Sequence, residues 1–97
     1  MLKNITVKEL KSILSPSINI IDLRSFEKYN TSHIEFSKNI PYLELLKNYD
    51  KYLDKTKVYH LYCQSGKVSL KLSIQLNNMG YNTINVLGGY QEWLISS

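Results

Sequence analysis

Apolar residues along the chain follow two spacings, one typical of helices and the other of short buried strands. Near the N-terminus, Thr6 and Glu9 have the spacing of a helix capping box, and the apolar positions that follow share one helical face up to Leu14. The segment Ile18–Leu23 is short, mostly apolar and rich in isoleucine, which predicts a buried strand. A short edge strand is expected before the first helix, over Leu2–Ile5.

The rest of the chain continues the alternation of helices and strands. The expected elements are a short helix near Phe26–Asn30 within the polar stretch Arg24–Lys38, a helix that begins near Pro41 with an apolar face up to Leu53, a strand at Val58–Tyr62, a helix at Ser65–Met79 closed by Gly80, a strand at Thr83–Leu87 and a short helix at Tyr90–Ile95. The helix over residues 65–79 has apolar residues on two opposite faces, so we expect it to be mostly buried. This order predicts an α/β sandwich with a mainly parallel sheet.

Length and composition fit one soluble domain over residues 1–97. The hydrophobic fraction is 43% and the charged fraction 21%, which are ordinary values for a soluble protein. The sequence has neither an apolar run long enough for a membrane-spanning helix nor the pattern of a signal peptide, so we expect a cytoplasmic protein without membrane association. Nothing in the sequence indicates an oligomeric state.

Charge and cysteine content narrow the possible partners. The net charge is +4, but the lysines are scattered and form no basic stripe, so binding to nucleic acid is not expected. A mild positive field would attract small anions, although for most of these lysines a solvated surface position explains them equally well. The single cysteine cannot form an internal disulfide, and no Cys and His residues have metal-ligand spacing, so we expect no metal.

The candidate chemistry lies at Cys63, which follows directly after the predicted strand Val58–Tyr62 and precedes a predicted helix. Ligands of such sheets bind beyond the carboxyl ends of the strands. A helix N-terminus favours the reactive thiolate through its unpaired N–H groups and dipole, and Gly66 lets the loop curl so that N–H groups point inward. The alternative is that Cys63 is simply a small buried side chain at a strand end.

Several stretches of the chain resemble signature segments of the rhodanese family. They are Ile20-Ile21-Asp22-Leu23-Arg24 followed by Glu27, Tyr29, His33-Ile34 and Asn39-Ile40-Pro41; the loop Cys63-Gln64-Ser65-Gly66-Lys67-Val68-Ser69, against Cys-x-x-Gly-x-Arg-Ser in the family; and Leu76, Gly80-Tyr81, Val86, Gly88-Gly89 and Trp93. The similarity runs from about Thr6 to Trp93. It implies a rhodanese-like three-layer α/β/α sandwich with a five-stranded, mainly parallel sheet.

The resemblance also implies a sulfurtransferase that carries sulfane sulfur as a persulfide on Cys63. The donor would be a small anion such as thiosulfate, the acceptor cyanide, a thiol or a protein, and no cofactor would be needed. Backbone N–H groups between Gln64 and Ser69 would stabilise the anionic sulfur. We expect supporting roles for Asp22 and Arg24, as a structural ion pair or cap, and for His33, as a structural histidine in preference to a proton donor.

Two departures from the family pattern qualify this expectation. The loop arginine of the family falls on Val68, which predicts weak turnover of thiosulfate unless the neighbouring Lys67 compensates. The family's glycine before the His-Ile pair is Ser32, and its Gly-Ala soon after falls on Phe36-Ser37, which we expect to alter a turn and not the chemistry.

Two other kinds of function compete with sulfur transfer. One is a binding module without catalysis, or a domain that only passes a persulfide to one protein partner, and Val68 favours this interpretation. The other is a cysteine-dependent phosphatase or arsenate reductase. The phosphatases need an arginine six residues after the cysteine to clamp phosphoryl oxygens, and that position is Ser69 here, which argues against them.

Overall fold

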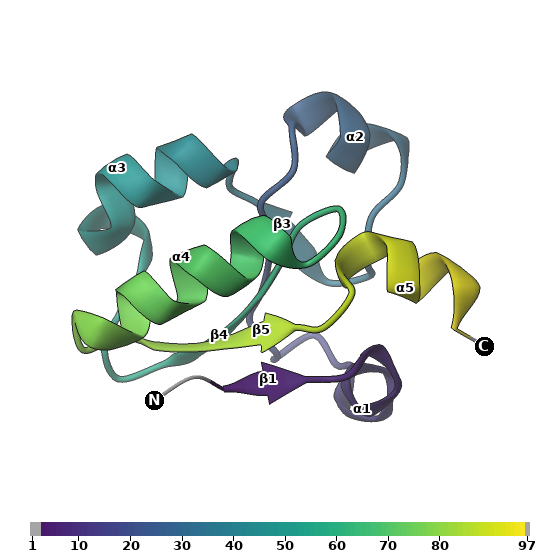
Figure 1. The fold of residues 1–97 in the computed structure, drawn as a ribbon, viewed down its shortest axis with the longest axis horizontal. Coiled ribbons are helices and arrows are strands. Elements are labelled where there is room, and N and C mark those ends of the chain that lie inside the picture. The colour runs from purple at the N-terminus through teal and green to yellow at the C-terminus, as the bar shows by residue number, and fades with distance from the viewer. Residues whose placement is uncertain (1–2, 97) are drawn as a thin grey trace.

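A computed structural model describes residues 3–96 and contains one five-stranded sheet (Figure 1). The strands, in chain order, are β1 (Asn4–Ile5), β2 (Ile20–Asp22), β3 (Ser37–Asn39), β4 (Val58–Tyr62) and β5 (Asn82–Val86). Their order across the sheet is β1-β5-β4-β2-β3, and all neighbouring strands are parallel. Every carboxyl end of a strand therefore lies at the same edge of the sheet.

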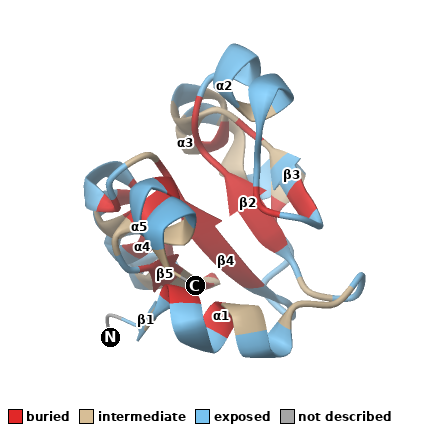
Figure 2. Ribbon diagram, turned by 90° about the vertical axis from the view of Figure 1, so that its right-hand side faces the viewer, coloured by how far each residue is buried: buried red, intermediate tan, exposed pale blue. Residues whose placement is uncertain are grey.

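Within residues 3–96, five helices complete the fold. They are α1 (Val7–Ile13), α2 (Phe26–Thr31), α3 (Tyr42–Tyr52), α4 (Lys67–Asn78) and α5 (Gly89–Ile95). The helices α3 and α4 cover one face of the sheet and α1 and α5 cover the other, whereas α2 lies beyond the carboxyl end of β2 (Figures 1 and 2). Within residues 3–96, no helix combines the length and apolar character needed to cross a bilayer.

The alternation of side chains along the strands builds two apolar cores. Ile21 and Leu61 point toward α3 and α4, while Ile20 and Tyr62, one residue away in each strand, point toward α1 and α5. Both faces of the central strands are therefore buried, as Figure 2 shows for β2 and β4. This is why their sequence is mostly apolar, with Asp22 and His60 as buried exceptions, and does not alternate between apolar and polar residues.

The order of elements confirms the predicted α/β sandwich, and the sheet is entirely parallel. The predicted capping box is present, because Glu9 N donates to Thr6 Oγ1 at 3.0 Å and Thr6 N to Glu9 Oε1 at 2.9 Å. The start of the predicted edge strand, Leu2, lies outside the described residues. The apolar pattern did not indicate β3, because this edge strand has only three residues, Ser-Lys-Asn.

The expectation that the helix after Cys63 is mostly buried is wrong. Val68 and Ile74 are 41% and 40% exposed, whereas Ser69 and Ser73 are completely buried. The buried face of α4 includes a polar seam, because Ser73 Oγ lies 2.8 Å from Thr83 Oγ1 on β5. Hydrogen bonds between helix and strand offset the burial of these hydroxyls.

Phe36, which departs from the glycine of the family pattern, lies in the turn before β3. Phe36 has a φ of +72°, in the left-handed region that favours glycine, and its side chain is exposed. Ser37 N donates to Ile34 O at 3.0 Å and closes the turn. The chain thus makes this turn without glycine, at a cost of about 1 kcal/mol.

His60 on β4 gives the fold a pH dependence. Its ring is buried, with Nδ1 3.1 Å from Asn19 O, and burial lowers the pKa of His60 below its usual value of 6.5. The folded protein therefore keeps the ring neutral under conditions in which the unfolded chain takes up a proton. This contribution to stability is complete above pH 6.5 and is lost as the pH falls through the lower folded-state pKa.

We predict that the free energy of unfolding decreases between about pH 7.5 and about pH 5.5, and decreases less in His60→Gln. Urea titrations at several pH values measure this slope. The matched control is His33→Gln, which removes an exposed imidazole and leaves the buried ring of His60 in place. An unchanged slope in His60→Gln would show that burial of this ring has no such effect.

Candidate functional site

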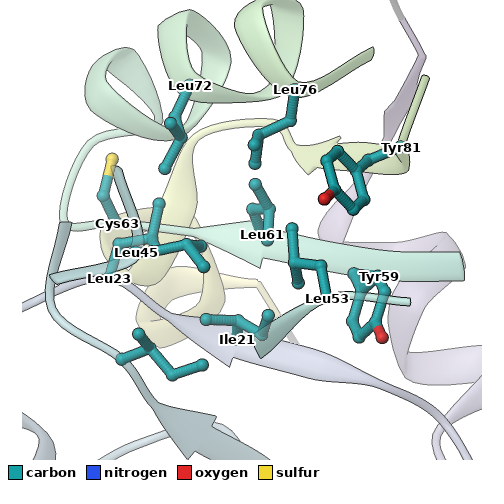
Figure 3. Packing of buried hydrophobic residues seen from close by; sticks show 11 residues of the cluster. Ile21, Leu23, Leu45, Leu53, Tyr59, Leu61, Cys63, Leu72, Leu76 and Tyr81 are labelled. Carbon is teal, nitrogen blue, oxygen red and sulfur yellow. The ribbon is translucent and has the colours of Figure 1, made fainter. Parts of the chain in front are cut away.

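Cys63 occupies the first position after β4, at the edge of the sheet where the strands end. It lies at one end of the core cluster between the sheet and α3 and α4, with Tyr59 and Tyr81 at the other end (Figure 3). The side chain is 6% exposed. The thiol therefore has an apolar floor on one side and the loop to α4 on the other.

The sulfur of Cys63 faces hydrogen-bond donors at the start of α4. Sγ lies 3.2 Å from Gly66 N and 3.4 Å from Ser69 N, and both N–H groups point toward it. These amides would otherwise be unpaired, because the first N–H groups of a helix have no partner within the helix. Together with the helix dipole, they provide a fixed site for a negatively charged sulfur.

Glycine is required for the curl of this loop. Gly66, the N-cap of α4, has a φ of +93°, and a Cβ there would lie 3.0 Å from Gly88 N. A side chain would therefore both strain the loop and push it away from the α5 turn. The predicted role of Gly66 agrees with this geometry.

An open cavity of about 340 Å³ lies next to Cys63. It is lined by Leu23, Arg24, Ser25, Lys28, Tyr42, Cys63, Gln64, Ser65 and Val68. Of the loop residues singled out from the sequence, Gln64, Ser65 and Val68 thus line the cavity. Gly66 and Ser69 contact the sulfur, and Lys67 is exposed and lies outside the set that lines the cavity.

Asp22 and Arg24 form a buried ion pair behind this cavity. Arg24 Nη2 lies 2.7 Å from Asp22 Oδ2, which also accepts a hydrogen bond from Tyr62 Oη at 2.6 Å. Burial acts against the charged form of Arg24, but the hydrogen bonds to Asp22 outweigh it and raise the pKa of Arg24. Burial and the bond to Asp22 also raise the pKa of Tyr62, so both side chains keep their protons.

Lys28 is the cation that the sequence analysis missed. Of the two cations that line the cavity, Arg24 is neutralised by Asp22, and its guanidinium lies 4.0 Å from the ring centre of Tyr90. Lys28 has no carboxylate within 4.0 Å among the described residues. It reaches the cavity because α2 lies beyond β2, and its position in an ordinary polar stretch gave no signal in the sequence.

His33 takes a structural position. Its ring stacks on Tyr29 with centroids 3.8 Å apart, and Nδ1 lies 2.8 Å from Tyr29 O. It is not one of the residues that line the cavity at Cys63. The preference for a structural histidine over a proton donor stays a prediction.

The N-terminus of α5 holds the cysteine loop from the other side. Tyr90 N donates to Cys63 O at 2.9 Å, and Gln91 N donates to Gln64 O at 3.0 Å. This close approach requires Gly89, where a Cβ would collide with Cys63 O and lie 2.8 Å from Gly66 N. The loop is therefore clamped between two helix N-termini.

Comparison with known proteins identifies relatives over nearly the whole chain. The family model described as "Rhodanese-like domain" matches residues 6–96. Thiosulfate sulfurtransferase 18 of Arabidopsis thaliana is 30% identical over 105 residues, which cover 94% of this chain and 77% of that protein. The putative sulfur carrier protein YrkF of Bacillus subtilis is 31% identical over 78 residues, which cover 79% of this chain and 42% of that protein.

Solved structures show the same fold. A rhodanese-like domain protein from Staphylococcus aureus has a TM-score of 0.84 and 31% sequence identity, covering 95% of this chain and 91% of that chain. A protein from Staphylococcus saprophyticus has a TM-score of 0.85 at 29% identity, with 95% and 93% covered. In larger relatives the match is one part: the tRNA sulfurtransferase of Shewanella pealeana is 35% identical over 86 residues, only 18% of its length.

We predict that Gly89→Ala destabilises the protein by about 2–4 kcal/mol, because the added Cβ forces the cysteine loop away from α5. The same variant should change the rate at which iodoacetamide alkylates Cys63. Gly80→Ala is the matched control: Gly80 also has a positive φ, of +95°, but a Cβ there meets only the Lys55 side chain at 3.5 Å.

Urea titrations and alkylation rates compare the two variants. The control should lose about 1 kcal/mol from backbone strain and keep the wild-type alkylation rate. Equal losses in both variants, with unchanged alkylation, would show that close packing at Gly89 is unimportant for the loop.

Proposed function

The chain belongs to the rhodanese-like domain family, and from this we propose that Cys63 accepts a sulfane sulfur from a donor, holds it as a persulfide and passes it to a thiol. The observation that carries the proposal is the pair of N–H groups, from Gly66 and Ser69, that face Sγ beside an open cavity. Relatives named as a sulfurtransferase and a putative sulfur carrier support the same chemistry.

The proposed reaction has two displacement steps. The Cys63 thiolate attacks the outer sulfur of thiosulfate, a new S–S bond forms, and sulfite leaves with the electron pair of the broken bond. The thiolate of an acceptor then attacks the outer sulfur of the persulfide, so that the acceptor becomes a persulfide and Cys63 is released as a thiolate. Cyanide in place of the thiolate gives thiocyanate. Neither step needs an added oxidant or reductant.

Different residues of the cavity have different effects on the binding of a sulfur donor. Lys28 supplies the charge that attracts an anionic donor, because the charge of Arg24 is neutralised by Asp22. Val68, at the position of the family's loop arginine, gives an apolar wall that offers a sulfonate group no hydrogen bond. Thiosulfate is therefore expected to bind weakly, and an organic persulfide to fit better.

Val68 also supports a second candidate, a carrier that exchanges persulfide with one protein partner and turns over thiosulfate hardly at all. A second hollow of about 430 Å³ shares Arg24, Lys28 and Gln64 with the cavity at Cys63 and extends it toward Leu94. Volumes of this size suit bound organic groups better than a small anion alone. The two candidates share the persulfide and differ in what delivers and removes the sulfur.

We predict that incubation with an organic persulfide adds one sulfur atom to the intact protein, as measured by mass spectrometry. The adduct should disappear after treatment with a small thiol, which completes the second step. Cys63→Ala should gain nothing, whereas Ser65→Ala, which alters the loop without touching the sulfur, should gain the same mass. Absence of an adduct with organic persulfides and with thiosulfate would refute the proposal.

We predict that Val68→Arg raises kcat/KM for thiosulfate by about tenfold, because a guanidinium at the cavity can hold the sulfonate oxygens with charge-assisted hydrogen bonds. Lys28→Gln should lower it by about fivefold. Val68→Leu, which keeps the wall apolar, should change little. Sulfite release measures all three rates, and an unchanged rate in Val68→Arg would rule out the missing charge as the limit.

A further inference from the structure

The hydroxyl group of Ser69 stands between Cys63 and a buried amide. Ser69 Oγ lies 3.4 Å from Cys63 Sγ, 3.2 Å from Gly66 O and 2.6 Å from Asn85 Oδ1 on β5. Ser69 is completely buried and Asn85 is 1% exposed, so water does not replace these partners. The hydroxyl has one proton to donate. Its shortest contact is the one to Asn85 Oδ1, so it donates its hydrogen bond to Asn85.

Asn85 is bound in turn by Asn4 on the edge strand β1. Asn85 Nδ2 donates to Asn4 Oδ1 at 3.1 Å, and the two residues are register partners in the parallel pair of β1 and β5. Asn4 is exposed. A continuous chain of hydrogen bonds therefore runs from the sulfur through Ser69 and Asn85 to the surface.

The same heavy atoms allow two complete hydrogen-bond arrangements. In the first, the Cys63 S–H donates to Ser69 Oγ, Ser69 donates to Asn85 Oδ1, and Asn85 Nδ2 donates to Asn4 Oδ1. In the second, both amides are turned over, so that Asn4 donates to Asn85, Asn85 donates to Ser69 Oγ, and Ser69 donates to the sulfur. The first arrangement suits a thiol and the second suits a thiolate or an anionic persulfide.

We propose that Asn85 is a positioning residue that acts through Ser69, and that the orientation of the Asn4–Asn85 amide pair sets how readily Cys63 ionises. Asn85 touches neither the sulfur nor the cavity. It controls whether the Ser69 hydroxyl accepts a proton from the thiol or donates one to the anion. Because Asn4 is exposed, water satisfies whichever of its amide atoms faces outward. The inference rests on the proposed function, which gives the ionisation of Cys63 its role in sulfur transfer. The ionisation itself can be measured without sulfur transfer.

Charged side chains surround the site on several sides. Asp22, Arg24 and Lys28 lie on the β2–α2 side, Lys67 at the start of α4, and Lys3 on the β1 side next to Asn4. A substitution at Asn4 leaves these groups in place. It changes only the amide arrangement and the local charge, and these two effects can be separated.

The test locks each arrangement by substitution at Asn4. In Asn4→Asp, the carboxylate only accepts, so Asn85 must keep Nδ2 toward it and Oδ1 toward Ser69, which holds the thiol arrangement. We expect alkylation of Cys63 by iodoacetamide at neutral pH to be about fivefold slower, the equivalent of one hydrogen bond, with its midpoint shifted to higher pH. In Asn4→Lys, the ammonium only donates, and alkylation should be faster by a similar factor.

Two controls separate the hydrogen-bond chain from simple charge effects. Lys3→Gln changes the charge by the same amount as Asn4→Asp, one residue away, and should not alter alkylation. In a Ser69→Ala background the chain is broken, and both Asn4 substitutions should lose their effect. Equal fold-changes with and without Ser69, or no change in either Asn4 variant, would overturn the inference.

The outcome of this test does not depend on the proposed function. Both Asn4 variants alter an exposed position on a two-residue strand, and circular dichroism checks that they fold. If one does not fold, the other still tests the sign of the shift. Failure to form a persulfide would remove the proposed function and leave the alkylation shifts intact, so the two failures can be told apart.

Discussion

The buried carboxylate of Asp22 joins the parts of the structure on which the site depends. It accepts hydrogen bonds from Tyr62 on β4 and from the guanidinium and backbone N–H of Arg24. Arg24 in turn donates to Ser32 O at the end of α2 and lies against Tyr90 of α5. A charge this deep is tolerated only when it is fully paired, so the ends of two strands and two helices are fixed relative to one another.

A second set of polar contacts, between α4 and β5, fixes how the helix packs against the sheet. Ser69, Ser73 and Asn77 recur every four residues on α4 and face Thr83 and Asn85 of β5. An apolar interface could slide by one turn, but hydrogen bonds between matched hydroxyls and amides permit one register. That register determines where the first N–H groups of α4 lie, and therefore how they meet the sulfur.

The sequence predicts the parts of this protein that local rules govern. The capping box at Thr6, the buried strands and the position of Cys63 after β4 all follow from spacing and strand order. The strand at Ser37–Asn39 and the cation Lys28 do not, because each depends on elements brought together by the fold. On β5, the polar side chains of Thr83 and Asn85 are buried as completely as Val86, while Ile84 is only half-buried, so hydrophobicity alone does not identify the polar face that packs against α4.

The clamp formed by α5 couples the chemistry of the site to the order of synthesis. Cys63 leaves the ribosome well before Tyr90 and Gln91, whose N–H groups bind the carbonyl groups of its loop, and β5 must also emerge before it can pair with β1. A nascent chain therefore carries the cysteine for a time without the surroundings that orient it. A fragment that ends before Gly89 would keep the thiol and lack the two hydrogen bonds that hold its loop.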